Sequence, residues 1–533
     1  MTQLRCLLPL LFVCPAAPVA AAEPLHKQID ALIAAGQKGH EKERAALAGD
    51  AEFFRRIYLD LAGLAPSPDE TRAFLADPDK TKREKLIDKL LASPAYARRM
   101  AWHFDVVLME RHADKKVPRA AWEEYLRASF AENKPYDAFA RELLAADGTD
   151  PKLRPAAKFY LDRDFEPNLV TKDVARVFLG RNLQCAQCHD HPLIDAYKQS
   201  EYFGILAFLN RTYLFPNAND AKAVLAEKAD GEVNFVSVFD KAKKQNTTLP
   251  RVMTGKAFEE PKLEKGKEYK VAPAKDVRPV PQYSRREKLA AAMTSAENPY
   301  FARAGANRLW ALMLGRGIVH PVDLDHAANP PSHPELLDLL AKEFVARKFD
   351  VKALLREIAL SETYQRSSEL PAGSDEPPAE RYLAGLLKPL SAEQLAFAAA
   401  QATGPIAKDP AMTTAPANAA GVTPTFRNMF GGQPGLPDHG TTTNLDQTLF
   451  LKFGGAVRSL IAPRGGSLAD RMMKATDPSA AAEDLFLSLY SRLPTAEEKQ
   501  DVAAAMKATP DRAAAIQELI WACLASSEFR FNH

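Results

Sequence analysis

Two cysteines and a histidine lie close together in the segment RNLQCAQCHDHPLIDAYKQSEYFG, residues 181–204. Cys185 and Cys188 are three positions apart, and His189 follows directly. The pattern Cys-x-x-Cys-His is the attachment signature of c-type haem. Two thiols at this spacing can form thioethers with the two vinyl groups on one edge of a porphyrin, and the adjacent imidazole can coordinate the iron. The segment therefore predicts one covalently bound haem c per chain, with His189 as the proximal ligand of the haem iron.

Two other chemistries use the same residue types. A disulfide between Cys185 and Cys188 would suit an oxidising compartment, but a redox motif of this kind follows a strand in a βαβ unit. Here the flanking segments 171–184 and 196–209 have the pattern of helices. A structural zinc site needs four ligands, and only His189 and His191 lie beside the cysteines. Haem is the favoured interpretation, and the alternative is a non-haem scaffold with this disulfide or another metal site.

A second axial ligand to the iron has to come from another part of the chain. His191 is two residues from His189 and cannot reach the opposite face of the same iron, so we expect it to shape the polar surroundings with Asp190. In the segment AYARRMAWHFDVVLMERH, residues 95–112, Met100 and His103 share one helix face at i, i+3 spacing. We expect His103 to be the distal iron ligand, with Met100 as the alternative. A hydrogen-bonded core histidine and an open distal position are the competing interpretations.

A second polar cluster occupies residues 307–338. Its members could line a pocket or bind a metal, but Asp and Asn at such spacing usually organise turns, so we expect a structural role. The cluster consists of Arg308, Trp310, Arg316, His320, Asp323, Asp325, His326, Asn329 and His333. The sequence contains no Walker loop, no His-Glu-x-x-His motif and no Ser-His-Asp order.

The N-terminus MTQLRCLLPLLFVCPAAPVAAAEP has one arginine, a short apolar stretch and a run of small residues. This pattern predicts a signal peptide over residues 1–22, and hence a periplasmic or secreted protein. The apolar stretch is too short to cross a bilayer, so an integral membrane protein is not expected. Cleavage would leave Cys185, Cys188 and Cys523, and we expect the last to be a buried free thiol. The formal net charge of +2 offers no electrostatic basis for binding nucleic acid.

The spacing of apolar residues predicts a mainly α fold with two helical domains joined by a small β-rich insert or linker. We place the first helical domain at residues 23–210, the insert at 211–283 and the second helical domain at 284–533. Short β-favouring runs at 232–239, 250–255 and 267–274 define the insert. Segments 404–426 and 429–443, rich in Gly, Pro and Thr, are expected to be long loops. Ser67, Ser332 and Thr495 are expected to begin helices.

Three segments echo one another at their ends. LIDKLLASPAY (86–96), LREIALSETY (355–364) and LIWACLASSEF (519–529) each end in an aromatic residue. The first and last also follow similar segments, IYLDLAGLAPSPDE (57–70) and LYSRLPTAEE (489–498). Apolar patterns of this kind usually encode packing, so we expect each aromatic residue to fill a core pocket.

The segment from His26 to Arg211, with FFRRIYLDLAGLAPSPDE and FLGRNLQCAQCHDHPLIDAYKQSEYFG, resembles the planctomycete-type cytochrome c-like domain of unknown function. The segment from Ser284 onward, with NPYFARAGANRLWALMLGRGIVHPVDL and LSETYQRSS, resembles the domain of unknown function that usually accompanies it. The resemblance implies haem c binding through Cys185, Cys188 and His189, and no activity is established for the family. The expected role is electron transfer with an unidentified redox partner protein, or a redox reaction on an unknown substrate. A polysaccharide-related compound is one candidate for this substrate. The non-haem alternative would bind carbohydrate or a protein partner.

Overall fold

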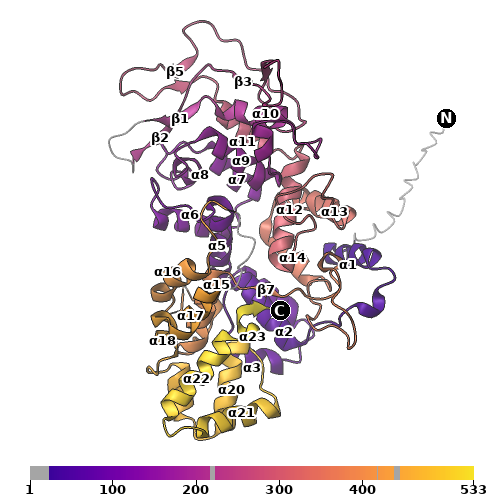
Figure 1. Cartoon of the computed structure of the whole chain (residues 1–533), viewed down its shortest axis with the longest axis vertical. Coiled ribbons are helices and arrows are strands. Elements are labelled where there is room, and N and C mark those ends of the chain that lie inside the picture. Colours follow the sequence, from indigo (N-terminus) through magenta and orange to yellow (C-terminus); the bar gives the residue numbers. More distant parts are fainter. Residues whose placement is uncertain (1–22, 216–221, 414, 417, 437–443) are drawn as a thin grey trace, which may run out of the picture.

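The computed structural model describes residues 23–215, 222–413, 415–416, 418–436 and 444–533. The chain is mainly α-helical, as the sequence predicts, and the strands in these ranges form only two-stranded sheets. Figure 1 shows an elongated molecule with the strand-bearing segment at one end and helices α20 (Pro478–Tyr490) and α21 (Ala496–Lys507) at the other. The predicted signal peptide, residues 1–22, lies outside the described residues.

Helices form most of residues 25–209. Ser67 Oγ accepts a hydrogen bond from the Glu70 N–H, and the Glu70 carboxylate accepts one from the Ser67 N–H, so the predicted capping box at α3 is confirmed. The helices are α1 (Leu25–Gly36), α2 (Asp50–Ile57), α3 (Pro68–Ala76), α4 (Lys82–Leu91), α5 (Pro94–Met109), α6 (Arg119–Ala131), α7 (Tyr136–Ala145), α8 (Lys158–Leu161), α9 (Pro167–Leu179) and α10 (Gln199–Leu209). Shorter turns are η1 (Glu41–Glu43), the π-helical η2 (Tyr58–Ala62) and η3 (Gln184–Gln187).

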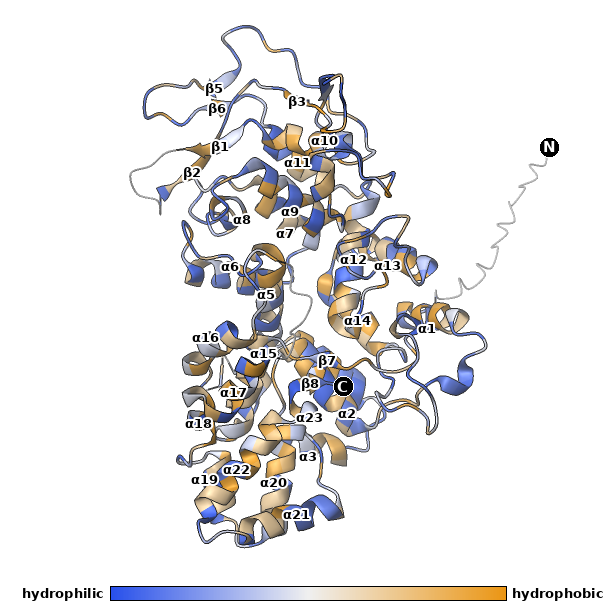
Figure 2. Ribbon diagram, viewed as in Figure 1, coloured by the Kyte–Doolittle hydropathy of each residue, from blue (hydrophilic) through white to orange (hydrophobic). Residues whose placement is uncertain are grey.

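The segment after α10 contains three antiparallel hairpins. They pair β1 (Thr212–Phe215) with β2 (Val224–Glu227), β3 (Val233–Phe235) with β4 (Asn246–Thr248), and β5 (Tyr269–Val271) with β6 (Val280–Pro281). The predicted β-favouring runs at 232–239 and 267–274 contain β3 and β5, whereas the run at 250–255 forms no strand. Figure 2 shows that the long connections around β3 and β5 are largely hydrophilic, while the helices carry hydrophobic faces.

Helices return from Arg285 onward. They are α11 (Arg285–Met293), α12 (Pro299–Leu314), α13 (Pro334–Ala346), α14 (Val351–Leu360), α15 (Ala392–Thr403), α16 (Ala419–Phe430), α17 (Leu445–Phe453), α18 (Gly455–Ile461), α19 (Leu468–Lys474), α20, α21, α22 (Arg512–Ala525) and α23 (Ser527–Arg530). Turns η5 (Ala379–Arg381) and η6 (Pro410–Met412) lie between them. The last hairpin pairs β7 (Lys388–Pro389) with β8 (Phe531–Asn532), so the end of the chain joins the segment before α15.

Two local predictions for this part of the chain are wrong. The end of the segment expected to be a loop, 404–426, belongs to α16, which buries Val422, Phe426 and Phe430 at i, i+4 spacing in spite of an internal proline. Ser332 does not cap α13, because its hydroxyl donates to the Ile318 carbonyl and His333 occupies the capping position. Residues 414, 417 and 437–443 of the predicted loops lie outside the described ranges.

The three echoing segments share one hydrogen-bond arrangement. In each, the serine hydroxyl donates to the carbonyl three residues earlier and accepts from the N–H of the aromatic residue three positions later. The serines are Ser93, Ser361 and Ser526, and the aromatic residues are Tyr96, Tyr364 and Phe529. All three aromatic side chains are buried in the core. The packing interpretation of the repeat is therefore confirmed.

Two consecutive buried arginines of α2 connect the beginning of the described chain to its end. Arg55 donates to the carbonyls of Leu489 at 2.8 Å and Phe529 at 3.0 Å. Arg56 donates to the carbonyls of Tyr364 at 2.7 Å and His533 at 3.0 Å. Since a guanidinium offers five donors, each side chain satisfies several carbonyls that would otherwise be buried without a partner.

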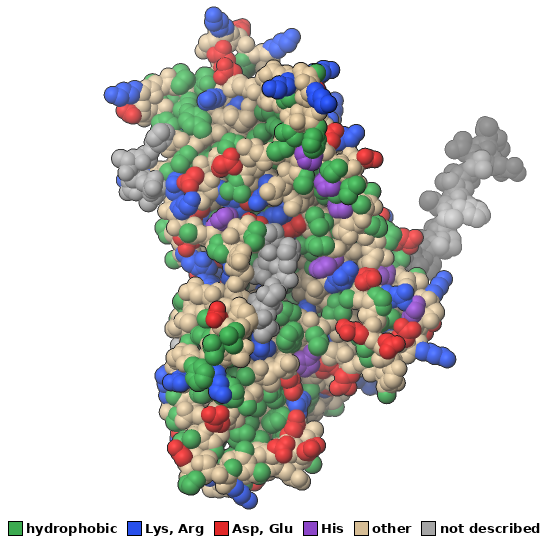
Figure 3. All heavy atoms as spheres, viewed as in Figure 1, with side chains coloured by type: hydrophobic (Ala, Val, Ile, Leu, Met, Phe, Trp, Pro, Cys, Tyr) green, Lys and Arg blue, Asp and Glu red, His purple; other side chains and the backbone are tan. Residues whose placement is uncertain are grey.

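One continuous hydrophobic core runs through the helices on both sides of the strand-bearing segment. Helix α9 packs on α12, α1 packs on α13 and α14, and α3 packs on α20. Figure 3 shows acidic and basic side chains interspersed over the drawn face. Among the helices of the described ranges, none has the length and apolar character that a bilayer span requires.

Replacing Arg55 by methionine should lower the free energy of unfolding by about 3 kcal/mol, because buried carbonyls of Leu489 and Phe529 would lose charged donors. Urea denaturation followed by circular dichroism would measure the change. Arg72→Met is the matched control, because Arg72 is largely exposed and makes surface ion pairs, so it should change the stability by less than about 1 kcal/mol. Equal urea midpoints for the two variants would contradict this role of Arg55.

Candidate functional site

The cysteine motif lies on a short turn after α9. Gly180 ends that helix with a φ of 65°, and η3 (Gln184–Gln187) follows. The Cys188 N–H donates to the Cys185 carbonyl at 3.3 Å, which closes the turn. Both thiols are free and exposed, so the structure contains no disulfide between them. Cys523 is also a free thiol, as expected, but it is half-buried rather than fully buried; this burial raises the pKa of the thiol.

The His189 ring is oriented by a hydrogen bond to the backbone. Its Nδ1 lies 2.7 Å from the carbonyl oxygen of Asp190. Because a carbonyl oxygen can only accept, Nδ1 carries the proton and Nε2 keeps its lone pair in the neutral ring. This backbone contact is the arrangement that commonly fixes the tautomer of a metal-binding imidazole. The ring also packs on Phe239, with centroids 4.7 Å apart.

Three exposed apolar side chains lie near the motif in sequence or in space. Leu193 is 83% exposed, and Val238 and Phe239 of the strand-bearing segment are 66% and 73% exposed. The Val238 N–H donates to the Cys188 carbonyl at 3.0 Å, so this segment lies directly against the motif. These exposed apolar side chains are available for contact with another molecule.

Asp190 and His191 organise the loop between η3 and α10. The Asp190 carboxylate accepts from the Gln199 N–H at the start of α10, at 2.8 Å. The His191 N–H donates to the Tyr197 carbonyl at 2.8 Å, and His191 Nδ1 accepts from the Leu193 N–H at 3.2 Å. These contacts hold the loop that follows the cysteine motif. The expected polar surroundings of a haem remain a prediction for both residues.

Part of the second polar cluster reaches the cysteine motif. The Asn182 N–H, three residues before Cys185, donates to the Asp323 carbonyl at 3.0 Å. The His326 ring packs on Tyr197 with centroids 5.3 Å apart. Burial lowers the pKa of His326, and the nearby His191 and Arg181 lower it further. Segment 321–326 therefore lies against the region around the motif.

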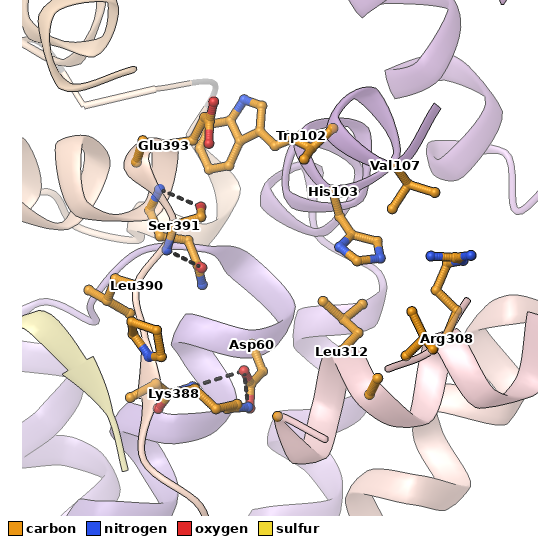
Figure 4. Close-up of a pocket in the computed structure, with 18 of the residues that line it drawn as sticks. Asp60, Trp102, His103, Val107, Arg308, Leu312, Lys388, Leu390, Ser391 and Glu393 are labelled. Atoms are coloured by element: carbon orange, nitrogen blue, oxygen red, sulfur yellow. Dashed lines mark hydrogen bonds and ion pairs between the residues drawn. The ribbon is translucent and has the colours of Figure 1, made fainter. Parts of the chain in front are cut away.

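The other end of the same segment lines a central pocket of about 410 Å³. The pocket lies between α5, α12 and the segment that joins β7 to α15. Figure 4 shows His103 of α5 and Arg308 of α12 directed into it. Its charged or titratable lining residues are Asp60, Arg99, His103, Arg111, Arg176, Arg308, His320, Asp323, Lys388 and Glu393.

Buried ion pairs join the walls of this pocket. Asp323 pairs with Arg308 at 2.7 Å and with Arg176 at 3.2 Å. Burial opposes the ionisation of Asp323, but the two guanidiniums outweigh it and lower its pKa. Lys388 pairs with Asp60 at 2.6 Å, as Figure 4 shows. The polar cluster at residues 307–338 was expected to have a structural role. Asp323 has this role through its ion pairs, and members of the cluster also line the central pocket.

Asp60 is a meeting point of three distant segments. Its carboxylate accepts from Lys388 Nζ, from the Tyr364 hydroxyl at 2.9 Å and from the Asn532 amide at 2.8 Å. It belongs to the π-helical turn η2, a type of irregularity that frequently occurs at functional sites. Gly63, which ends this turn at a φ of 72°, allows Arg99 to pack closely, since a Cβ there would lie 2.9 Å from Arg99 Cδ.

The structure places His103 in the central pocket rather than beside the cysteines. Cys185, Cys188 and His189 are not among the lining residues, and no hydrogen bond or ring contact joins them to His103 in the described part of the chain. Met100 is buried in the hydrophobic core. The assignment of His103 or Met100 as distal iron ligand therefore stays a prediction.

His103 has an unusual environment for a core histidine. Burial, together with the charges of Arg99 and Arg308, lowers the pKa of His103 well below its usual value, so the ring is neutral. Its Nε2 is buried and has no hydrogen-bond partner among the described residues. The interpretation of His103 as a hydrogen-bonded core residue is therefore wrong for this atom.

Sequence reasoning missed the remaining charged residues of the pocket. Arg99 precedes His103 by one helical turn, a spacing that could have been noticed. Asp60 and Lys388 are 328 residues apart, so no local pattern reveals that they pair. Within the described residues, no group of three or more His, Cys, Asp or Glu side chains is arranged to hold a metal ion.

Comparisons with known protein families divide the chain into two matched segments, one on each side of the strand-bearing segment. Residues 28–213 match the family PSCyt2, described as a protein of unknown function (DUF1549), and residues 285–428 match the family PSD1, described as a protein of unknown function (DUF1553). No curated protein and no solved structure is significantly similar to the chain. The cysteine motif and α5 lie in the first match, and α12 and α15 lie in the second, so the central pocket is formed by both. The chain therefore carries a segment of the DUF1549 family followed by a segment of the DUF1553 family.

Proposed function

We propose that the chain is an exported protein that binds one haem c covalently through Cys185 and Cys188, with His189 as the proximal ligand of the iron. The observation that carries the proposal is the geometry of His189: its Nδ1 is committed to the Asp190 carbonyl, which leaves Nε2 for a metal. The two free, exposed thiols that precede it in sequence can be reached by an incoming porphyrin.

The surroundings of the motif suit such a group. A porphyrin needs apolar contacts for its ring, and the exposed Leu193, Val238 and Phe239 are available next to the motif. The porphyrin itself supplies four nitrogen ligands to its iron, so the protein has to provide only axial ligands. Haem binding therefore does not require a cluster of three or more metal-binding side chains, and the described residues contain none.

Bound haem would supply one-electron transfer, and the role that we propose is electron exchange with a redox partner protein. The exposed position of Cys185 and Cys188 supports this role, since it would leave the attached edge of the ring accessible to another protein. Export through the predicted signal peptide is part of the proposal. Covalent attachment suits an exported protein, because a freely dissociating cofactor would be lost outside the cell interior. The candidate substrate of any coupled redox reaction is a polysaccharide-related compound.

Production in a host with c-type haem maturation should yield a protein that keeps haem after denaturation. The double variant Cys185→Ala, Cys188→Ala should lose it, because no thioether can form. Pyridine haemochrome absorbance and the intact mass would measure attachment. Cys523→Ala is the matched control and should keep haem fully. A colourless wild-type protein with a mass lower by two hydrogens would contradict the proposal and favour the disulfide scaffold that binds carbohydrate or a protein.

The distal ligand can be tested by spectroscopy on the haem-loaded protein. If His103 coordinates the iron, His103→Phe should convert a low-spin visible spectrum to a high-spin one, because the replacement keeps the ring volume and removes the ligand nitrogen. Met100→Leu is the matched control, as it preserves the packing of a buried side chain. A spectrum changed only by Met100→Leu would assign methionine instead, and one changed by neither variant would reject both ligands.

A further inference from the structure

Arg99 differs from the other cations that line the central pocket. Arg308 and Arg176 pair with Asp323, and the remaining two, Arg111 and Lys388, pair with Glu393 and Asp60 respectively. Arg99 makes no hydrogen bond and no ion pair with any described residue. Its side chain is nevertheless only 7% exposed.

A buried guanidinium without a partner is costly to the folded protein. Desolvation disfavours the charge, and Nε of Arg99 is buried with no hydrogen-bond partner among the described residues. Burial lowers the pKa of Arg99, whereas the more distant carboxylates of Asp60 and Glu393 oppose this effect. Natural chains retain such unfavourable groups mainly where function requires them.

A second unsatisfied group faces the same pocket. His103 follows Arg99 by four residues on α5, so both lie on one face of the helix. The buried Nε2 of His103 lacks a hydrogen-bond partner in the described part of the chain. The pocket therefore offers one unpaired positive charge and one polar atom without a partner.

The rest of the wall is largely apolar. Trp102, Val107, Leu312 and Leu390 contribute side chains, and Figure 4 shows them around the space that His103 faces. A cavity of about 410 Å³ lies within the range typical of small-molecule sites. The carboxylates of the pocket already have cationic partners, and Arg176 also pairs with Glu110 outside the lining, so Arg99 is the one lining arginine or lysine without a carboxylate partner among the described residues.

We propose that the central pocket binds a small organic carboxylate, whose carboxylate group pairs with the Arg99 guanidinium while its apolar part packs against Trp102 and Leu312. The planar guanidinium fork matches a carboxylate with two hydrogen bonds. A single unmatched charge favours a monoanion over a phosphate dianion, which would bring excess negative charge close to Asp60, Asp323 and Glu393. The proposal uses no haem and does not depend on the proposed function.

Isothermal titration calorimetry on the full chain would test this with hexanoate and benzoate as probes. Both should bind, whereas hexanamide and benzamide, which have nearly the same shape without the charge, should bind at least tenfold more weakly. Inorganic phosphate serves as the competing anion. Binding of phosphate alone, equal binding of acid and amide, or no binding of either carboxylate would each overturn the proposal.

Arg99→Met should weaken carboxylate binding by about tenfold to a hundredfold, because the charged donor is removed while the apolar stem is kept. Arg99→Lys, which keeps the charge but not the fork, should have intermediate affinity. Arg127→Met on the exposed face of α6 is the matched control and should bind as the wild type does. Unchanged affinity in both Arg99 variants would overturn the assignment. Repeating the titration on the double cysteine variant separates this result from any failure of haem attachment.

Discussion

The buried carboxylate of Asp323, bound between Arg176 and Arg308, is the interaction on which the relative placement of the helices depends. Arg176 belongs to α9 and Arg308 to α12, so one carboxylate connects the two family domains. Arg176 also pairs with Glu110, which follows α5, at 2.8 Å. Breaking a buried pair of this kind leaves an uncompensated charge and typically costs about 3–5 kcal/mol. The walls of the central pocket are held in place by this network.

Segment 321–326 gives the two candidate sites a common support. At its beginning, Asp323 lines the central pocket, and its carbonyl accepts the Asn182 N–H just before the cysteine motif. At its end, His326 packs on Tyr197 of the loop that follows the motif. A change in the packing of this segment would therefore shift residues at both the central pocket and the cysteine motif, because closely packed interiors transmit small displacements. These contiguous contacts give a physical route by which a change at one place can reach the other.

Local features of the fold were predictable from the sequence, and long-range pairing was not. Ser67 and Thr495 begin helices through capping boxes as expected, because the residues that define such a cap lie within one turn. Ser332 failed as a cap because a distant carbonyl, that of Ile318, takes its hydroxyl. The cysteine motif could be recognised in the sequence because its chemistry needs residues that are close together in the chain. The central pocket could not be predicted, since Asp60 contacts its partner Lys388 only in the folded chain.

The contacts of Arg55 have a consequence for the order in which the molecule can fold. The carbonyls that this side chain satisfies lie 434 and 474 residues further along the chain. Contacts of such separation form late, because a long loop must close before they contribute. The core around α2 therefore cannot be completed until the last helices have been synthesised. Such a delay keeps the nascent polypeptide incompletely packed until its C-terminal helices are available.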